Sequence, residues 1–235
     1  MNKSKRWEQA QNYEKNWWDK RAPEISFDFY KTFADELRKF IEEDFTITSD
    51  TKILEIGSGA GGIITFLTES NHRYAIDPLE KFYASQSQFV EQRDKEVNYS
   101  DGKGESLSFE NDFFDLVIMD NVLDHCENPA LVFSEATRVL KKSGHIYFKQ
   151  NKYNIWGKTI RSIMEYFLID KGHPFTFTRP MLIKLVRDNS LVVMNKTRTG
   201  YFKTWKKEIS SFIAKDLIKA LLFVTRDKVT CLLRK

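Results

Sequence analysis

The sequence contains little cysteine, proline or glycine, and it lacks any long apolar run. Its 235 residues include 2 cysteines, 5 prolines and 10 glycines. Two thiols cannot form the disulfide framework of a small secreted scaffold, and so little Gly and Pro excludes a collagen-like or low-complexity chain. No apolar stretch approaches the roughly 20 residues that a membrane-spanning helix needs. We therefore expect a globular protein without a membrane span.

The cysteines and the amino terminus bear on metal binding and location. Cys126 and Cys231 lie far apart in the sequence and make no metal-type spacing, so we expect no metal ion. The first residues have no apolar core and no small-residue cleavage site of the kind that marks a secretory signal. We therefore expect a cytoplasmic location, in which both thiols stay reduced.

Charge is distributed unevenly along the chain. Residues 1–140 carry 16 Lys/Arg and 27 Asp/Glu, a net charge of −11, whereas residues 141–235 carry 21 and 6, a net charge of +15. Such an asymmetry suggests that the second half faces an anionic partner. The alternative is a solvated basic surface that only keeps the protein soluble.

Apolar periodicity predicts a chain in which strands alternate with helices. The expected strands are 52–56, 73–77, 97–100, 115–119, 145–149, 191–198 and 228–233. The expected helices are 4–20, 28–43, 61–70, 79–93, 129–140, 154–169, 179–189 and 206–222. Such alternation is typical of βαβ units, so the prediction is an α/β fold with a mostly parallel sheet.

A glycine-rich turn follows the first expected strand. Gly57, Gly59 and Gly62 satisfy the G-x-G-x-x-G pattern, which allows a tight turn and a close approach of the backbone to a ligand. Asp77 lies 20 residues after Gly57, where a carboxylate can accept both hydroxyls of a ribose. Glu55 stands two residues before Gly57, and a second carboxylate there would repel a pyrophosphate. The pattern thus favours a cationic or amino-bearing nucleoside over a dinucleotide.

These residues resemble the motifs of class I S-adenosylmethionine-dependent methyltransferases. Within that family they are similar to the ubiquinone/menaquinone-type branch, which acts on small molecules. The resemblance is strong over about residues 50–150 and weak over 173–198. The motifs that carry it occur in the order of the family: Glu55-x-Gly57-x-Gly59-x-Gly61, Gly104–Phe109, Phe114–His125 and Glu135–Tyr147. The resemblance implies a Rossmann-like doubly wound sheet of seven strands, the last one antiparallel, and S-adenosylmethionine as cofactor.

The resemblance also implies roles for particular residues. The residues expected around the cofactor are Glu55, Gly57, Gly59 and Gly61 at the methionine part, Asp77 at the ribose, Pro78, Gly104 and Glu105 at the adenine, and Asp120 and Asn121 beside the sulfonium. One residue departs from the family pattern. Lys103 stands where an acidic residue often meets the adenine amino group, so that contact is expected from Asp101 or a backbone carbonyl instead.

Six further side chains are candidates for the acceptor side. His125 and His173 are the candidate catalytic residues, and the alternative for each is a histidine held by the structure. Tyr13, Trp17 and Trp18 lie on a helix ahead of the core that is expected to form a lid over the substrate, and the alternative is an aromatic stripe packed on the sheet. Arg179 is the candidate for an anionic acceptor group, because a guanidinium can form two hydrogen bonds to a carboxylate or phosphate.

The resulting prediction is one methyltransferase domain over residues 1–235. It comprises an N-terminal helical lid (1–45), a cofactor-binding core (46–150) and an acceptor-side elaboration with the last strands (151–235). The predicted activity is methylation of a small-molecule acceptor, at the oxygen of an anionic metabolite or sugar. The alternatives are an RNA methyltransferase that uses the basic second half, a non-catalytic cofactor-binding module of the same fold, and a nicotinamide-dependent oxidoreductase.

Overall fold

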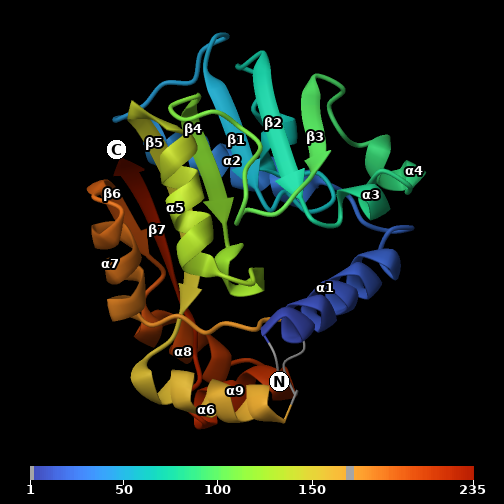
Figure 1. Ribbon diagram of the computed structural model, residues 1–235. Helices are drawn as coiled ribbons and strands as arrows, with labels where there is room; N and C mark the ends of the chain where they lie inside the picture. Colours follow the sequence, from blue (N-terminus) through green and yellow to red (C-terminus); the bar gives the residue numbers. More distant parts are fainter. Residues whose placement is uncertain (1–2, 168–171) are drawn as a thin grey trace.

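The computed structural model describes residues 3–167 and 172–235. A twisted sheet forms the centre, with α5 on one face and α2 on the other, and α1 crosses the space beyond the carboxyl ends of the first strands (Figure 1). Helices α6, α8 and α9 gather below the sheet in this view. Of the helices within the described ranges, none is both long and apolar enough to cross a membrane.

The sheet has seven strands in the order β3-β2-β1-β4-β5-β7-β6. Their bounds are β1 Lys52–Ile56, β2 His72–Asp77, β3 Val97–Asp101, β4 Phe114–Asp120, β5 Leu140–Lys152, β6 Val192–Arg198 and β7 Asp227–Arg234. Strands β1 to β5 pair in parallel, and β7 runs antiparallel to both β5 and β6. The predicted α/β fold with seven strands and an antiparallel last strand is confirmed.

Helices connect and cover the strands. Their bounds are α1 Lys3–Asp19, α2 Asp28–Ile41, η1 Ile63–Phe66, α3 Glu80–Tyr83, α4 Ser87–Val90, η2 Leu123–His125, α5 Pro129–Val139, α6 Ile155–Tyr166, α7 Arg179–Asp188, α8 Tyr201–Ile209 and α9 Ala214–Leu221. Helix α5 begins with Pro129 in its first turn, and the side chain of Asn128 accepts the Leu131 amide there, which satisfies one of the free donors of the helix end.

Three expected helices are wrong in extent. The helix expected over 61–70 is only the short 3₁₀ turn η1, because Ile63, Ile64 and Thr65 are β-branched and disfavour a longer helix. The helix expected over 79–93 is divided into α3 and α4. The helix expected over 206–222 is divided into α8 and α9 by a turn in which the Ser211 hydroxyl accepts the amide of Ile213. The final two residues of the helix expected over 154–169 lie outside the described residues.

The core has two layers because successive strand residues point to opposite faces of the sheet. On one face, Leu54 and Ile56 pack with Val117 and the residues of α5. On the other face, Ile53 packs with Leu37 and the rest of the apolar side of α2. Both layers are buried, so the sheet is held rigidly and its carboxyl ends form a fixed edge for a ligand.

Candidate active site

A cavity of about 350 Å³ opens at the carboxyl ends of the parallel strands. Helix α1 covers it from one side, and the segments that follow β1, β2, β3 and β4 contribute to its lining, together with the end of β5 and the start of β7. The residues that line the cavity include Trp7, Gln11, Glu14, Trp18, Glu55, Gly57, Gly59, Asp77, Pro78, Lys103, Gly104, Glu105, Asp120, Asn121, His125, Asn151, Arg226 and Lys228. The cavity thus brings together most of the residues that the sequence singles out.

The glycine turn after β1 adopts the backbone that only glycine takes readily. Gly57 and Gly59 have φ values of +74° and +59°, in the left-handed region that disfavours a side chain. A Cβ atom on Gly57 would lie 2.2 Å from the side chain of Val122. Both glycines line the cavity, so the turn presents backbone without side chains there, as a close-fitting ligand requires.

Asp77 lies at the carboxyl end of β2 and faces the cavity. Its two carboxylate oxygens accept the amides of Gly59 and Leu79, each at 2.9 Å. Each oxygen keeps a lone pair for a further donor, such as a hydroxyl group. Burial raises the pKa of Asp77 to about 7, and the carboxylate of Glu14 adds to this effect. Hydroxyl donors from a ligand would stabilise the charged form.

Glu55 lies inside the end of β1, where its carboxylate accepts the amides of Ile63 and Ile64 at 3.2 and 2.9 Å. The amino-terminal amides of η1 are therefore bound by Glu55 and are not free to bind a ligand. Burial raises the pKa of Glu55 to about 8, although these two hydrogen bonds oppose the shift. Glu55 thus braces the glycine turn as well as lining the cavity.

The other predicted cofactor residues lie around the same cavity, with one exception. Glu105 accepts the amides of Glu127 and Asn128 at 2.8 and 2.9 Å, which fixes the loop before α5. Pro78, Gly104, Asp120 and Asn121 also line the cavity. Gly61 faces away from it, because a Cβ atom there would lie 2.3 Å from the ring of Phe27. The small size of Gly61 therefore serves packing.

His125 lines the cavity and is paired with Glu14 of α1. Its Nδ1 atom lies 3.3 Å from a carboxylate oxygen of Glu14. Burial favours the neutral imidazole, but Glu14, with help from Asp124 and Asp77, outweighs burial and raises the pKa of His125 to about 9. The same pairing lowers the pKa of Glu14, against the effect of its burial. At neutral pH the two residues form an imidazolium–carboxylate pair.

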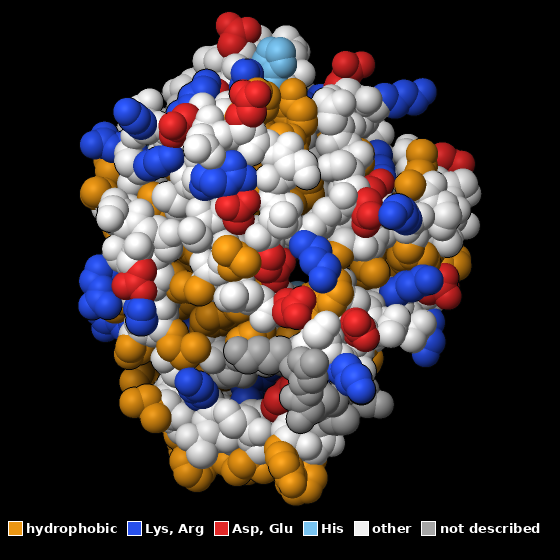
Figure 2. All heavy atoms as spheres, in the orientation of Figure 1, with side chains coloured by type: hydrophobic (Ala, Val, Ile, Leu, Met, Phe, Trp, Pro, Cys, Tyr) orange, Lys and Arg blue, Asp and Glu red, His pale blue; other side chains and the backbone are white. Residues whose placement is uncertain are grey.

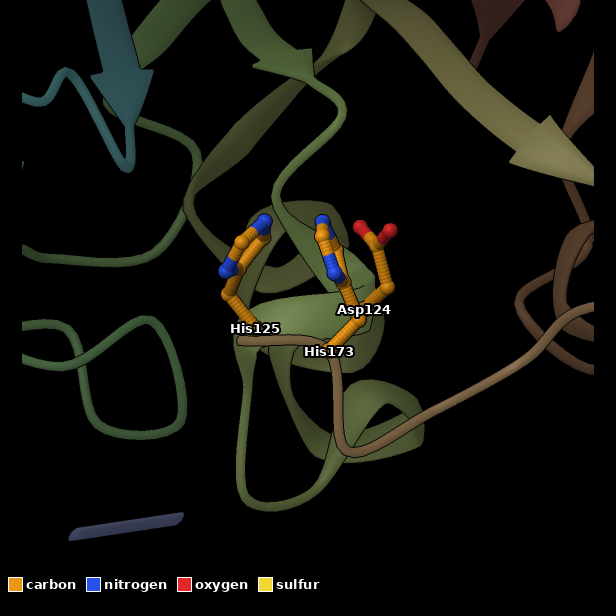
Figure 3. Close-up of side chains that lie close together, drawn as sticks. All are labelled: Asp124, His125 and His173. Atoms are coloured by element: carbon orange, nitrogen blue, oxygen red, sulfur yellow. The ribbon is translucent and has the colours of Figure 1, made fainter. Parts of the chain in front are cut away.

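His173 stacks beside His125, with ring centroids 4.7 Å apart, and Asp124 lies next to them (Figure 3). One ligand atom from each of the three residues lies within 4.8 Å of the others. Atoms that share one zinc ion at 2.0–2.1 Å lie closer, roughly 3.3 Å apart. Asp124 also accepts a hydrogen bond from Gln150 at 2.9 Å. As placed, the three side chains form a polar cluster that supports the His125 ring.

The aromatic residues of α1 divide between the cavity and the surface. Trp7 and Trp18 line the cavity, whereas Tyr13 and Trp17 are 46% and 38% exposed and are not among its lining residues. Trp18 also packs edge-on against Phe89 in the core. The helix therefore covers the cavity, and of the three aromatic residues expected there Trp18 lines it whereas Tyr13 and Trp17 do not.

Basic side chains near the last strands lie in or beside the cavity. Arg226 and Lys228, at the start of β7, are among its lining residues. Lys149 lies beside it and forms an ion pair with Asp120 at 3.1 Å. Arg179 instead lines a second cavity, of about 570 Å³, between α7 and the β6–β7 edge of the sheet. Its predicted contact with an acceptor would therefore have to occur there.

Sequence reasoning missed several lining residues. Gln11 and Glu14 come from α1, and Asn151, Arg226 and Lys228 come from the ends of β5 and β7. The side-chain oxygens of Gln11 and Asn151 are buried and have no hydrogen-bond partner within the described part of the chain. Both can accept hydrogen bonds from a ligand. The one available signal was the position of Asn151, Arg226 and Lys228 at strand ends, the edge where ligands of this fold bind.

Comparison with known proteins gives the class of the chain. Residues 54–148 match the protein family described as "Methyltransferase domain". A crystal structure of geranyl diphosphate C-methyltransferase from Streptomyces coelicolor, in complex with Mg²⁺, geranyl diphosphate and S-adenosyl-L-homocysteine, has a TM-score of 0.65. The alignment covers 90% of this chain and 85% of that one, at 13% identity. Residues 54–148 thus match a methyltransferase domain, and the chain has the fold of class I S-adenosylmethionine-dependent methyltransferases.

Two curated relatives are more similar in sequence but match over less of their length. An uncharacterized protein of Methanocaldococcus jannaschii is 31% identical over 137 residues, which are 58% of this chain and 56% of that protein. Sarcosine/dimethylglycine N-methyltransferase of Aphanothece halophytica is 31% identical over 104 residues, which are 42% and 37% of the two chains. The chain therefore spans about half or less of the length of these relatives.

Proposed function

We propose that this protein is an S-adenosylmethionine-dependent methyltransferase that acts on a small anionic acceptor. One observation carries the proposal. A single cavity joins the glycine turn and Asp77, which suit a nucleoside, to a histidine–carboxylate pair and two cations, which suit an acceptor. Its volume of about 350 Å³ supports a small molecule better than a nucleic acid, which needs an extended surface.

The residues present fit the cofactor. Asp77 has lone pairs available for the ribose hydroxyls, and the bare backbone of Gly57 and Gly59 permits close approach. The remaining residues proposed to hold it are Glu55, Pro78, Gly104, Glu105, Asp120 and Asn121. When bound, S-adenosylmethionine supplies a methyl group activated by a positively charged sulfur. The protein has to align the acceptor, exclude water and remove a proton.

His125 is the residue proposed to remove that proton. Its Nδ1 atom faces Glu14, which leaves Nε2 for an acceptor hydroxyl. Glu14 holds the imidazole ring in place and stabilises its imidazolium form, so the minor neutral form of His125 is the one that takes the proton. Oxygen is the proposed attacked atom, since the segment Asp120–Leu123 lacks the asparagine-proline-proline pattern that holds nitrogen acceptors. His173, stacked on His125, is proposed to orient it.

Arg226 and Lys228 are proposed to bind the anionic group of the acceptor. Both line the same cavity as His125, and a guanidinium can form two hydrogen bonds to a carboxylate or phosphate. The sarcosine/dimethylglycine N-methyltransferase relative is named for substrates that carry a carboxylate, which supports an anionic acceptor and makes nitrogen the alternative attacked atom. The predicted cytoplasmic location belongs to this proposal, and the two buried free cysteines are compatible with it.

The experiment is an acceptor screen that measures release of S-adenosylhomocysteine. The panel contains phosphorylated sugars, hydroxy acids, sarcosine, dimethylglycine and neutral analogues of each. We expect anionic acceptors to react best and Arg226→Ala to raise the KM of the acceptor without changing cofactor affinity. Arg179→Ala, in the second cavity, is the matched comparison. Preference for neutral acceptors, together with no effect of Arg226→Ala, would contradict the anionic assignment.

A further inference from the structure

Exposed apolar side chains gather on one side of the molecule, on the helices that lie below the sheet. Orange side chains collect along the lower edge of Figure 2, where Figure 1 places α6 and α9. Phe212 is fully exposed, and Ile155 and Phe202 are 77% and 75% exposed. The members of this surface, which we call the basal face, are Ile155, Trp156, Ile163, Phe202, Ile209, Phe212, Ile213, Leu217, Ile218, Leu221, Leu222 and Phe223. A group of this size is unusual on a soluble monomer and indicates a binding surface.

The helices that carry the basal face are joined to one another. The indole of Trp156 in α6 donates to the carbonyl of Leu222 at 3.0 Å. The indole of Trp205 in α8 donates to the carbonyl of Ala220 in α9 at 3.0 Å. The Trp205 ring also stacks on Phe223. The exposed residues are therefore held in place together by three helices.

The segment that forms most of the basal face is basic. Residues 201–226 carry six Lys/Arg and two Asp/Glu, a net charge of +4. The acids are already engaged, since Glu208 is buried and accepts the Thr225 hydroxyl at 2.6 Å, and Asp216 pairs with Lys219 at 2.8 Å. The exposed lysines of the segment are Lys203, Lys206, Lys207 and Lys215. Phe, Leu and Ile beside exposed lysines are the composition of helices that lie in a membrane interface.

We propose that the basal face docks the protein onto the surface of an anionic membrane. The apolar side chains enter the boundary between headgroups and acyl chains, and the lysines meet the acidic headgroups. A second copy of the chain fits this surface less well, because a two-fold interface brings the same patch of both subunits together and so opposes like charges. Arg226, three residues after Phe223, lines the active-site cavity, so docking would bring that cavity near the membrane.

The test is flotation of the full-length protein with lipid vesicles. One set contains phosphatidylcholine with about 30 mol% phosphatidylglycerol, and the other contains phosphatidylcholine alone. We expect at least about tenfold more bound protein on the anionic vesicles, with binding reduced by high salt. Equal binding to both sets, or no binding to either, overturns the proposal.

Paired variants assign the binding to the basal face. The double variant Phe212→Ser/Ile218→Ser should lose at least about tenfold in binding, and so should Lys206→Gln/Lys207→Gln. The matched controls, Val90→Ser/Leu131→Ser and Lys31→Gln/Lys39→Gln, change exposed residues elsewhere and should bind as wild type does. Circular dichroism confirms that each variant is folded. Binding that is unchanged in both basal-face variants refutes the proposal.

Sedimentation velocity tests the alternative that a second copy of the chain, and not a membrane, binds the basal face. If the wild type is a dimer that Phe212→Ser/Ile218→Ser converts to a monomer, and neither binds vesicles, the basal face joins two copies and the membrane assignment is wrong. The proposal does not depend on methyl transfer. Affinity for S-adenosylhomocysteine in the absence of lipid should be the same in wild type and in all four variants, so failure of one proposal is distinguishable from failure of the other.

Discussion

Replacement of Glu14 by glutamine should lower the pKa of His125. In the wild type that pKa is about 9, so roughly 1% of the imidazole is neutral at pH 7. Glutamine keeps the size of the side chain but removes the charge that stabilises the imidazolium. Burial lowers the pKa of His125, and in the variant only Asp124 and Asp77 would remain to oppose that effect. The pKa should therefore fall toward its ordinary value of 6.5. The loss corresponds to roughly 2–3 kcal/mol of differential stabilisation.

Two measurements check this prediction. The first is a nuclear magnetic resonance titration of the imidazole carbon-bound protons. The chain has only 4 histidines, so His125→Gln identifies the signal. The second is the pH dependence of kcat with a hydroxyl acceptor. If His125 is the base, the rate should rise tenfold per pH unit up to about pH 9 in the wild type. In Glu14→Gln the rise should end at a lower pH.

The result that would refute the reasoning is specific. If the His125 signal titrates near pH 6.5 in both proteins, Glu14 does not pair with it in solution, and the contact between α1 and the site is wrong. If the pKa shifts as expected but the rate does not follow it, the pair exists and His125 is not the base. Asp19→Asn, an exposed acid at the end of α1, is the matched control and should leave both measurements unchanged.

Two further predictions concern stability. Gly61→Ala should destabilise the fold by about 1–3 kcal/mol, because the added methyl would lie 2.3 Å from the Phe27 ring, whereas Gly102→Ala, whose nearest contact would be 3.9 Å, should be tolerated. Urea unfolding measures both, and equal stabilities would contradict the packing. The ligand-free protein should also become less stable as the pH rises from about 4 to 8. Burial raises the pKa values of Asp77 and Glu55 to about 7 and 8. The folded state therefore binds protons more tightly than the unfolded chain, and this advantage is lost as the pH rises. Thermal unfolding from pH 5 to 8.5 checks the sign, and a rising Tm would refute it.

Local signals in the sequence predict the core of the fold. β1 occupies the expected residues Lys52–Ile56, because a short run of buried apolar residues ends at a glycine that must take a left-handed conformation. Asp77 is found at the end of β2 for a similarly local reason, since Pro78 prevents the strand from continuing. The connection rules of parallel sheets limit the possible strand orders but do not by themselves select the observed one.

Contacts between distant segments were not predictable in this way. Glu14 meets His125 only because α1 packs across the carboxyl edge of the sheet, and nothing near either residue encodes that crossing. The division between α8 and α9 depends on the hydrogen bond to Ser211, which competes with a helix that apolar periodicity alone would continue. The position of Arg179 in the second cavity likewise depends on how α7 packs against the β6–β7 edge of the sheet.

Calorimetric titration with S-adenosylhomocysteine tests the central claim most directly. The wild type should bind this product of methyl transfer, and Asp77→Ala should weaken binding by about 1.5–3 kcal/mol, which is roughly a 10- to 150-fold rise in Kd. Asp50→Ala, an exposed acid in the loop before β1, should bind as the wild type does, and circular dichroism should confirm that both variants are folded. No binding by the wild type, or an unchanged Kd in Asp77→Ala, would contradict the assignment of this cavity as the cofactor site.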